Sequence, residues 1–114
     1  MIVYGIKNCN TVKVALEWLN TKKIDFEFHD YKSKGISEAK LKDWCKQIGW
    51  ESLVNKRGTT WRQLDETVQK KITNEKAAVA LMREKTSVIK RPLIEENGKV
   101  LALGFDEKVF KNKF

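Results

Sequence analysis

A single cysteine stands where a short apolar stretch meets an amphipathic one. Residues 4–19 read YGIKNCNTVKVALEWL, so Cys9 follows a candidate strand and precedes a candidate helix by one or two residues. Unpaired backbone N–H groups and partial positive charge gather at a helix N-terminus. A thiolate there is stabilised, its pKa falls, and thiolate is the nucleophilic form of cysteine. We therefore predict a reactive nucleophile at Cys9, aided by the positive charge of Lys7.

The second cysteine, Cys45, reads as a packing residue. It lies between Trp44 and Ile48 on the apolar face of a predicted helix, where a thiol behaves as a small apolar group. Val12 stands three residues after Cys9, so this junction has no CxxC pair. Two cysteines and one histidine supply neither a disulfide framework nor a zinc ligand set. We predict no metal and no bound cofactor, and a resolving thiol that comes from outside the chain.

Strands and helices must position this thiol, and their order is that of an α/β protein. Residues 2–6 alternate loosely. In residues 24–31 (IDFEFHDY), Ile24, Phe26 and Phe28 alternate with three polar residues, as in a strand. Between them, apolar residues recur at helical spacing, with Asn10 or Thr11 as the expected cap. A strand, helix and strand within about 30 residues predict two parallel strands.

The rest of the chain is predicted to be helical first and β-type afterwards. Ser37 can cap a second helix, and residues 51–86 continue with helical spacing. Residues 87–105 then contain an Asn-Gly pair at 97–98 between two apolar runs, which indicates an antiparallel hairpin. A short last helix is expected to start near Asp106.

These elements predict one domain over residues 1–114. It is a mixed four-stranded sheet flanked by helices, with a helical insertion at about residues 51–86. Within that insertion, Trp61, Leu64 and Val68 have the spacing of a shared helical face.

Composition and charge limit the partners. The formal net charge is +8 over 114 residues, but the lysines are scattered and form no basic stripe interleaved with aromatic residues. We expect this charge to attract anionic small molecules to the protein surface, and we do not expect nucleic acid to be the main partner. No apolar run reaches a membrane-spanning length, and the N-terminal residues do not resemble a signal peptide. A cytoplasmic monomer is the expectation.

Four segments resemble the arsenate reductase family that couples to glutathione and glutaredoxin, which also includes the Spx regulators. They are YGIKNCNTVKVALEWL, FHDYKSKGI, LVNKRGTTWRQLD and IKRPLIEENGKVLALGF, and the small YffB-like branch is the nearest match. The resemblance implies a thioredoxin-like fold with Cys9 as the nucleophile. It also implies that Pro92 is a cis-proline whose loop faces the thiol. Arg91 would then lie beside the cysteine and bind an oxyanion or a carboxylate.

The chain departs from the arsenate reductases at two anion ligands. Members that reduce arsenate use three arginines around the cysteine, and Arg91 matches one of them. Asn55 stands where the second is expected, with Arg57 near but out of register, and Gly104 or a neighbour stands at the third. Losing two charged donors weakens the binding of a multiply charged oxyanion, so the pattern does not favour arsenate as the substrate.

The mechanism expected from these observations uses glutathione as a co-substrate. The Cys9 thiolate attacks a small-molecule or protein disulfide, and glutathione or glutaredoxin resolves the mixed disulfide. Lys7, Lys90 and Arg91 would attract the anionic peptide, and the backbone before Pro92 would align it.

Several other residues are candidate pocket contacts. Asn8, Thr11 and Asn55 are among them, although Thr11 also suits a helix cap. His29 ends a strand on its polar side and is predicted to be a surface residue, not a base.

Two alternatives stay open on the sequence. One is arsenate reduction proper. The other is an Spx-like module that binds RNA polymerase without turnover, although the absence of CxxC removes the disulfide switch at this junction.

Overall fold

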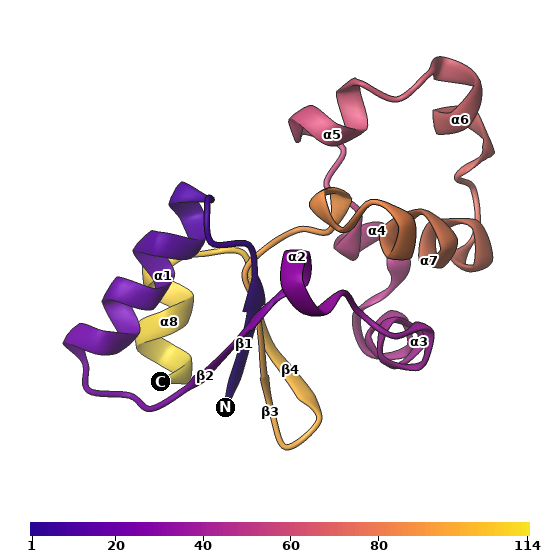
Figure 1. The fold of residues 1–114 in the computed structure, drawn as a ribbon. Coiled ribbons are helices and arrows are strands. Elements are labelled where there is room, and N and C mark those ends of the chain that lie inside the picture. The colour runs from indigo at the N-terminus through magenta and orange to yellow at the C-terminus, as the bar shows by residue number, and fades with distance from the viewer. The chain divides into compact units, whose positions relative to one another are not determined.

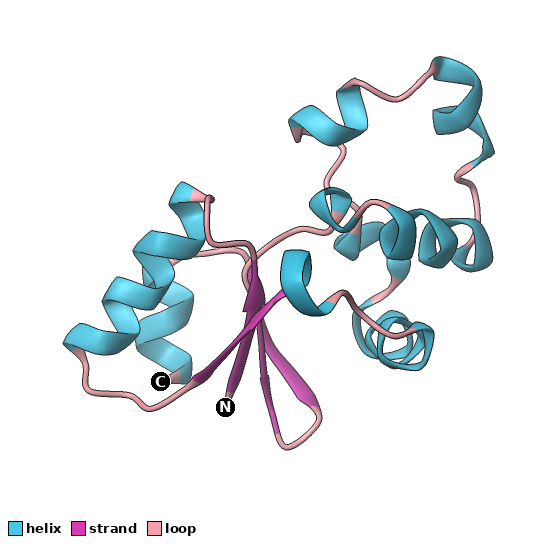
Figure 2. Cartoon of the chain, viewed as in Figure 1, coloured by secondary structure: helices cyan, strands magenta, loops and turns pink.

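The computed structural model describes residues 1–114, and the chain divides into two compact units (Figures 1 and 2). Unit 1 is Met1–Lys34 with Arg91–Phe114, and unit 2 is Gly35–Lys90. The predicted single domain with an insertion at about 51–86 stays a prediction. No helix is long and apolar enough to cross a membrane. No group of three or more His, Cys, Asp or Glu side chains could hold a metal ion.

Unit 1 carries the sheet. Its elements are β1 (Ile2–Gly5), α1 (Asn10–Thr21), β2 (Glu27–Asp30), α2 (Tyr31–Lys34), β3 (Leu93–Glu96), β4 (Lys99–Leu103) and α8 (Glu107–Lys113). The strand order is β2-β1-β3-β4, with β1 parallel to β2 and antiparallel to β3. This mixed four-stranded sheet with flanking helices confirms the predicted thioredoxin-like α/β fold.

The hairpin between β3 and β4 forms at the predicted Asn-Gly pair. Asn97 and Gly98 have φ of 50° and 81°, the left-handed region that a two-residue hairpin turn requires. Strand β2 is shorter than the predicted strand over residues 24–31, because residues 24–26 stay outside the sheet and Tyr31 begins α2. The Ile24 N–H donates instead to Leu19 O at 3.0 Å, which closes the end of α1.

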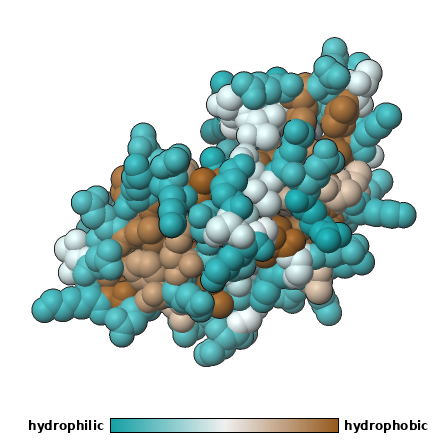
Figure 3. All heavy atoms as spheres, viewed as in Figure 1, coloured by the Kyte–Doolittle hydropathy of each residue, from teal (hydrophilic) through white to brown (hydrophobic).

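Helices α1 and α8 lie side by side and cover one face of the sheet (Figure 1). Trp18 of α1 meets Phe110 of α8 edge to face, with ring centroids 5.3 Å apart. Helix α8 starts after Asp106, near the predicted position, and the Asp106 carboxylate caps it by accepting from Lys108 N at 2.9 Å. Figure 3 shows apolar side chains gathered over the region of these helices. The buried residues of this core are Val3, Ala15, Leu19, Ile94, Ala102 and Phe110.

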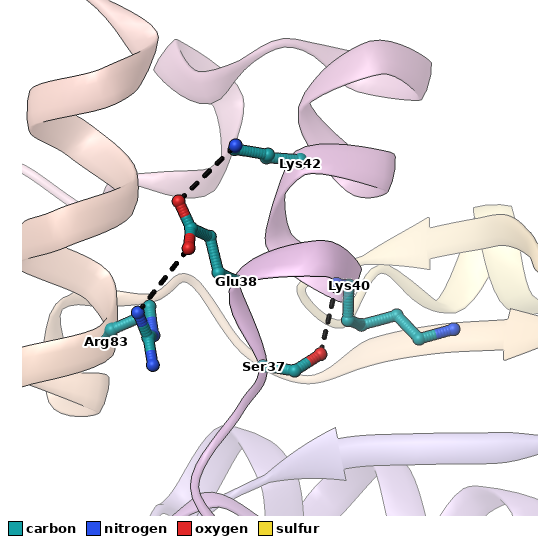
Figure 4. A network of polar contacts seen from close by, with 5 residues as sticks. All are labelled: Ser37, Glu38, Lys40, Lys42 and Arg83. Carbon is teal, nitrogen blue, oxygen red and sulfur yellow. Dashed lines mark hydrogen bonds and ion pairs between the residues drawn. The ribbon is translucent and has the colours of Figure 1, made fainter.

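Unit 2 consists of helices. They are α3 (Glu38–Ile48), α4 (Trp50–Leu53), α5 (Thr59–Arg62), α6 (Glu66–Lys71), α7 (Glu75–Glu84) and the 3-10 turn η1 (Thr86–Val88). Ser37 caps α3 as predicted, because its hydroxyl oxygen accepts from Lys40 N at 3.1 Å (Figure 4). Glu38 contacts Lys42 in its own helix at 3.3 Å and Arg83 of α7 at 3.7 Å, so this carboxylate links α3 to α7.

The predicted shared face of Trp61, Leu64 and Val68 is wrong. Helix α5 ends before Leu64, and α6 begins after it, so the three residues do not share one helix. Trp61 is buried, whereas 37% of Val68 is exposed. Gln69 Nε2 donates to Trp61 O at 2.7 Å. In a continuous helix, a backbone N–H group would donate to this carbonyl oxygen instead.

Candidate active site around Cys9

Cys9 is the N-cap residue of α1. Its backbone is extended, with φ −133° and ψ 120°, and its carbonyl accepts the first helical hydrogen bond from Lys13 N at 2.9 Å. The cap predicted at Asn10 or Thr11 is therefore wrong, because both residues already lie in the first turn. The partly exposed thiol stands at the helix N-terminus, the position from which its reactivity was predicted.

The surroundings of the thiol favour its ionised form. Partial burial raises the pKa of Cys9, but the Val12 N–H, the hydrogen bond and charge of the Arg91 side chain, and the Thr11 N–H outweigh it. The net pKa is lowered from the ordinary value of 9.0. More thiolate is therefore present at neutral pH than for a free cysteine, which makes Cys9 a better nucleophile there.

A close contact between β1 and α1 holds the first turn of the helix in place. A Cβ atom built on Gly5, at the end of β1, would lie 2.9 Å from Cγ2 of the buried Val12. Only glycine leaves room for the Val12 side chain at this distance. Val12 is also the residue whose backbone N–H lowers the pKa of Cys9.

Arg91 and Pro92 approach from the start of β3. The peptide bond between them is cis, as the family resemblance implied. Pro92 O accepts from Gly104 N at 2.8 Å, which ties this turn to the end of β4. The Arg91 side chain interacts with Cys9, so two residues far apart in the sequence meet in unit 1. Their roles in binding and catalysis stay predictions.

The remaining predicted site residues fall into two groups. Lys7 and Asn8 form an exposed turn between β1 and Cys9, so they flank the thiol along the chain. Lys90 and Asn55 belong to unit 2, where the Lys90 backbone N–H donates to Leu53 O at 2.7 Å. The Asn55 side-chain oxygen accepts from Arg57 N at 3.1 Å, so it organises a local turn.

Cys45 has the environment of a core residue. The side chain lies in α3 with 6% of its surface exposed. Burial, with a smaller contribution from Glu75, raises the pKa of Cys45 to about 11. The thiol stays protonated at neutral pH, which agrees with the prediction that Cys45 packs.

Sequence reasoning missed an aromatic and acidic cluster on the other face of the sheet. The Tyr4 hydroxyl donates to Glu95 Oε1 at 3.2 Å, and the Tyr4 ring stacks on Tyr31 with centroids 6.2 Å apart. The predicted surface residue His29 is instead partly buried, with its ring centroid 4.8 Å from that of Tyr4. A signal was available, because Tyr31 is the last residue of a strand predicted to lie parallel to the one before Cys9.

Comparison with known proteins gives consistent matches over nearly the whole chain. The model of the ArsC family matches residues 4–112. A protein of uncharacterised function from Haemophilus influenzae is 46% identical over 112 residues, which cover 98% of this chain and 96% of that protein. A solved structure of a YFFB protein has a TM-score of 0.91 and 40% identity, covering 98% of this chain and 96% of its own.

A more distant match is the global transcriptional regulator Spx from Lactiplantibacillus plantarum. It is 26% identical over 109 residues, which cover 94% of this chain and 80% of that protein.

Proposed function

The chain belongs to the ArsC family, and on that premise we propose that it is a glutathione-dependent thiol/disulfide oxidoreductase with Cys9 as its nucleophile. The observation that carries the proposal is the set of groups around the thiol. Two backbone N–H groups of the first turn and the Arg91 guanidinium together lower the pKa of Cys9. Backbone donors and a positive charge at a helix N-terminus are what activates a thiol for attack on a disulfide.

The reaction has two exchange steps. The Cys9 thiolate attacks one sulfur of a disulfide substrate, the Cys9–S bond forms, and the other substrate sulfur leaves as a thiolate. The thiolate of glutathione, or of glutaredoxin, then attacks the mixed disulfide and releases the Cys9 thiolate. Each turnover consumes one external thiol, which leaves as a disulfide with the remaining half of the substrate, so the enzyme needs no second cysteine of its own. A second glutathione reduces that product disulfide away from Cys9.

Basic residues support glutathione as the thiol donor. Glutathione is an anion, and the positive charges of Lys7, Lys90 and Arg91 favour its approach. We assign Asn8 and Thr11 as further contacts within this proposal, with the backbone before Pro92 aligning the peptide. Reduced glutathione is abundant in a reducing compartment, so the proposed site of action is the cytoplasm.

The alternative function is a regulator that binds a partner protein without catalytic turnover, and one similarity to a known protein favours it. The protein that is 26% identical is a transcriptional regulator, so a related binding role for this chain is a second candidate. Pull-down with the α-subunit of RNA polymerase separates the two candidates. Capture that does not depend on Cys9, without any thiol exchange, would favour the binding role.

The first test is intact mass after incubation with oxidised glutathione near neutral pH. Wild-type protein is expected to gain one glutathione, and reduced glutathione is expected to remove it. Cys9→Ser should gain none, whereas Cys45→Ser should behave as wild type because the pKa of Cys45 is about 11. A wild-type chain that stays unmodified, or one modified at Cys45, would overturn the proposal.

A further inference from the structure

Apolar side chains that reach the surface continue along helix α1 from the end that carries Cys9. Val14 is 46% exposed, and Trp18 lies one turn further along the same side of the helix. Trp18 in turn packs against Phe114, with ring centroids 6.4 Å apart, and both of these aromatic side chains are only partly buried. We call Val14, Trp18 and Phe114 the α1 ridge. One exposed valine needs no explanation, but a connected apolar surface is a common mark of an interaction site.

The α1 ridge begins close to the candidate nucleophile. Each helical residue advances about 1.5 Å along the axis, so Val14 lies about 7.5 Å beyond Cys9 along α1 and Trp18 about 13.5 Å beyond it. A standard protein interface covers about 800 Å² on each partner, which is about 30 Å across. A protein that brings a disulfide to Cys9 from this side of α1 therefore also covers the ridge.

The charges beside the α1 ridge favour an acidic partner. The exposed charged side chains of residues 7–23 are one acid, Glu17, and four lysines, Lys7, Lys13, Lys22 and Lys23. Lys22 borders the ridge directly, because its Nζ lies 5.7 Å from the centre of the Trp18 ring. This excess of positive charge attracts carboxylates. It also repels a second copy of this chain, since the net charge of each copy is +8.

A protein disulfide can match both properties of this surface, because an apolar side chain and carboxylates can stand beside its cysteine. Oxidised glutathione supplies carboxylates but no apolar side chain. We propose that the α1 ridge docks protein substrates whose disulfide is flanked by an apolar side chain and acidic residues. This inference rests on the proposed function and deepens it by naming the substrate class. The exchange is unchanged, because the Cys9 sulfur bonds to one substrate sulfur and the other leaves as a thiolate.

Model peptides test this docking in a single exchange step. Each peptide carries its cysteine as a mixed disulfide with 5-thio-2-nitrobenzoate, so attack by Cys9 on the peptide sulfur releases a coloured thiolate. The first probe is acetyl-Cys-Gly-Glu-Leu-Glu-amide, because three extended residues span about 10 Å, enough to reach from Cys9 to Val14. The second probe has Ser in place of Leu, and the third has Lys in place of both Glu residues.

The first readout is the ratio of the rate constants for the Leu and Ser peptides, which cancels any general change in thiol reactivity. Wild-type protein is expected to give a ratio of about five, as partial burial of one leucine side chain would produce. Val14→Ser should bring this ratio close to one. Val109→Ser is the matched control, because it removes a valine of α8 that is 38% exposed and lies outside the ridge, and it should keep the wild-type ratio.

The second readout is the preference for the Glu peptide over the Lys peptide. Wild-type protein should prefer the Glu peptide at low ionic strength, and added salt should reduce this preference. Lys13→Glu places a negative charge beside Val14 and should reduce the preference much more than Lys99→Glu, which makes the same change in β4. Equal effects of the two substitutions would mean that net charge alone is responsible, and would overturn the acidic part of the inference.

The remaining outcomes also decide the inference. It is overturned if the wild-type Leu/Ser ratio is near one, if Val14→Ser keeps the wild-type ratio, or if Val109→Ser loses it equally. Sedimentation equilibrium tests the other occupant, because a wild-type dimer that Val14→Ser dissociates would assign the ridge to a second copy. Failure of the proposed function is a different result, since Cys9 would then react with neither oxidised glutathione nor any of the peptides.

Discussion

The side chain of Val12 occupies the space that a Cβ on Gly5 would need, 2.9 Å from Val12 Cγ2. Valine is stiff about χ1 and cannot swing away at low cost. Gly5→Ala is therefore expected to lower the free energy of unfolding by about 1–3 kcal/mol, the usual effect of overpacking. Urea denaturation monitored by tryptophan fluorescence measures this change.

A double-mutant cycle identifies the cause of that loss. Val12→Ala removes both methyl groups, so Gly5→Ala should cost much less in the Val12→Ala background than in the wild type. Equal costs in the two backgrounds would show that the close approach of β1 and α1 is not responsible.

Replacing Arg91 should make Cys9 a weaker nucleophile. In Arg91→Gln the positive charge and the charged hydrogen bond to the thiolate are lost, so the pKa of Cys9 should rise. Alkylation by iodoacetamide near pH 7 should then slow by about tenfold, and the midpoint of its pH profile should move upward. Lys99→Gln removes one exposed charge from the same unit and should leave the profile almost unchanged. An identical shift in both variants would point to net charge in general.

Stability should depend on pH through the Cys9 thiol. The folded state lowers the pKa of Cys9 below its ordinary value of 9.0, so the folded state binds fewer protons than the unfolded state between these two values. The resulting stabilisation is fully present above pH 9.0 and is lost as the pH falls through the lowered pKa. Wild-type protein should therefore gain stability relative to Cys9→Ser as the pH rises from 6 to 9. A difference that stays flat over this range in parallel urea titrations would contradict the lowered pKa.

The two cysteines should differ strongly in reactivity. At neutral pH the Cys45 thiol, with its pKa near 11, is almost wholly protonated and is also 6% exposed. Iodoacetamide should label Cys9 at least ~100-fold faster than Cys45 in the folded protein. Peptide mapping at early times measures the ratio, and 8 M urea provides the control in which the two rates should approach one another. Comparable labelling without denaturant would show that α3 opens readily.

The sequence predicted the parts of the fold that depend on local chemistry. The predicted cap at Ser37 and the predicted helix start near Asp106 both form, because each side-chain oxygen accepts from backbone N–H groups two or three residues ahead. The hairpin at Asn97 was also predictable, because the turn depends on two adjacent residues. The individual helices within residues 51–86 were predicted less accurately, because short helices separated by turns give the same apolar spacing as longer ones.

The site was predictable only where one segment determines it. The placement of Cys9 at a helix start follows from the residues on either side of it. The cluster of Tyr4, Tyr31 and Glu95 was missed because its members come from β1, α2 and β3, which only the folded sheet brings together. No spacing rule expresses that combination.

The separation in sequence between Cys9 and Arg91 has a consequence for the newly made chain. During synthesis the N-terminal cysteine emerges early, but the guanidinium that activates it is translated only after the whole of unit 2. Arg91 reaches the thiol once β3 has paired with β1. A ribosome-bound chain therefore carries Cys9 without its guanidinium, and full reactivity arrives with completion of the sheet.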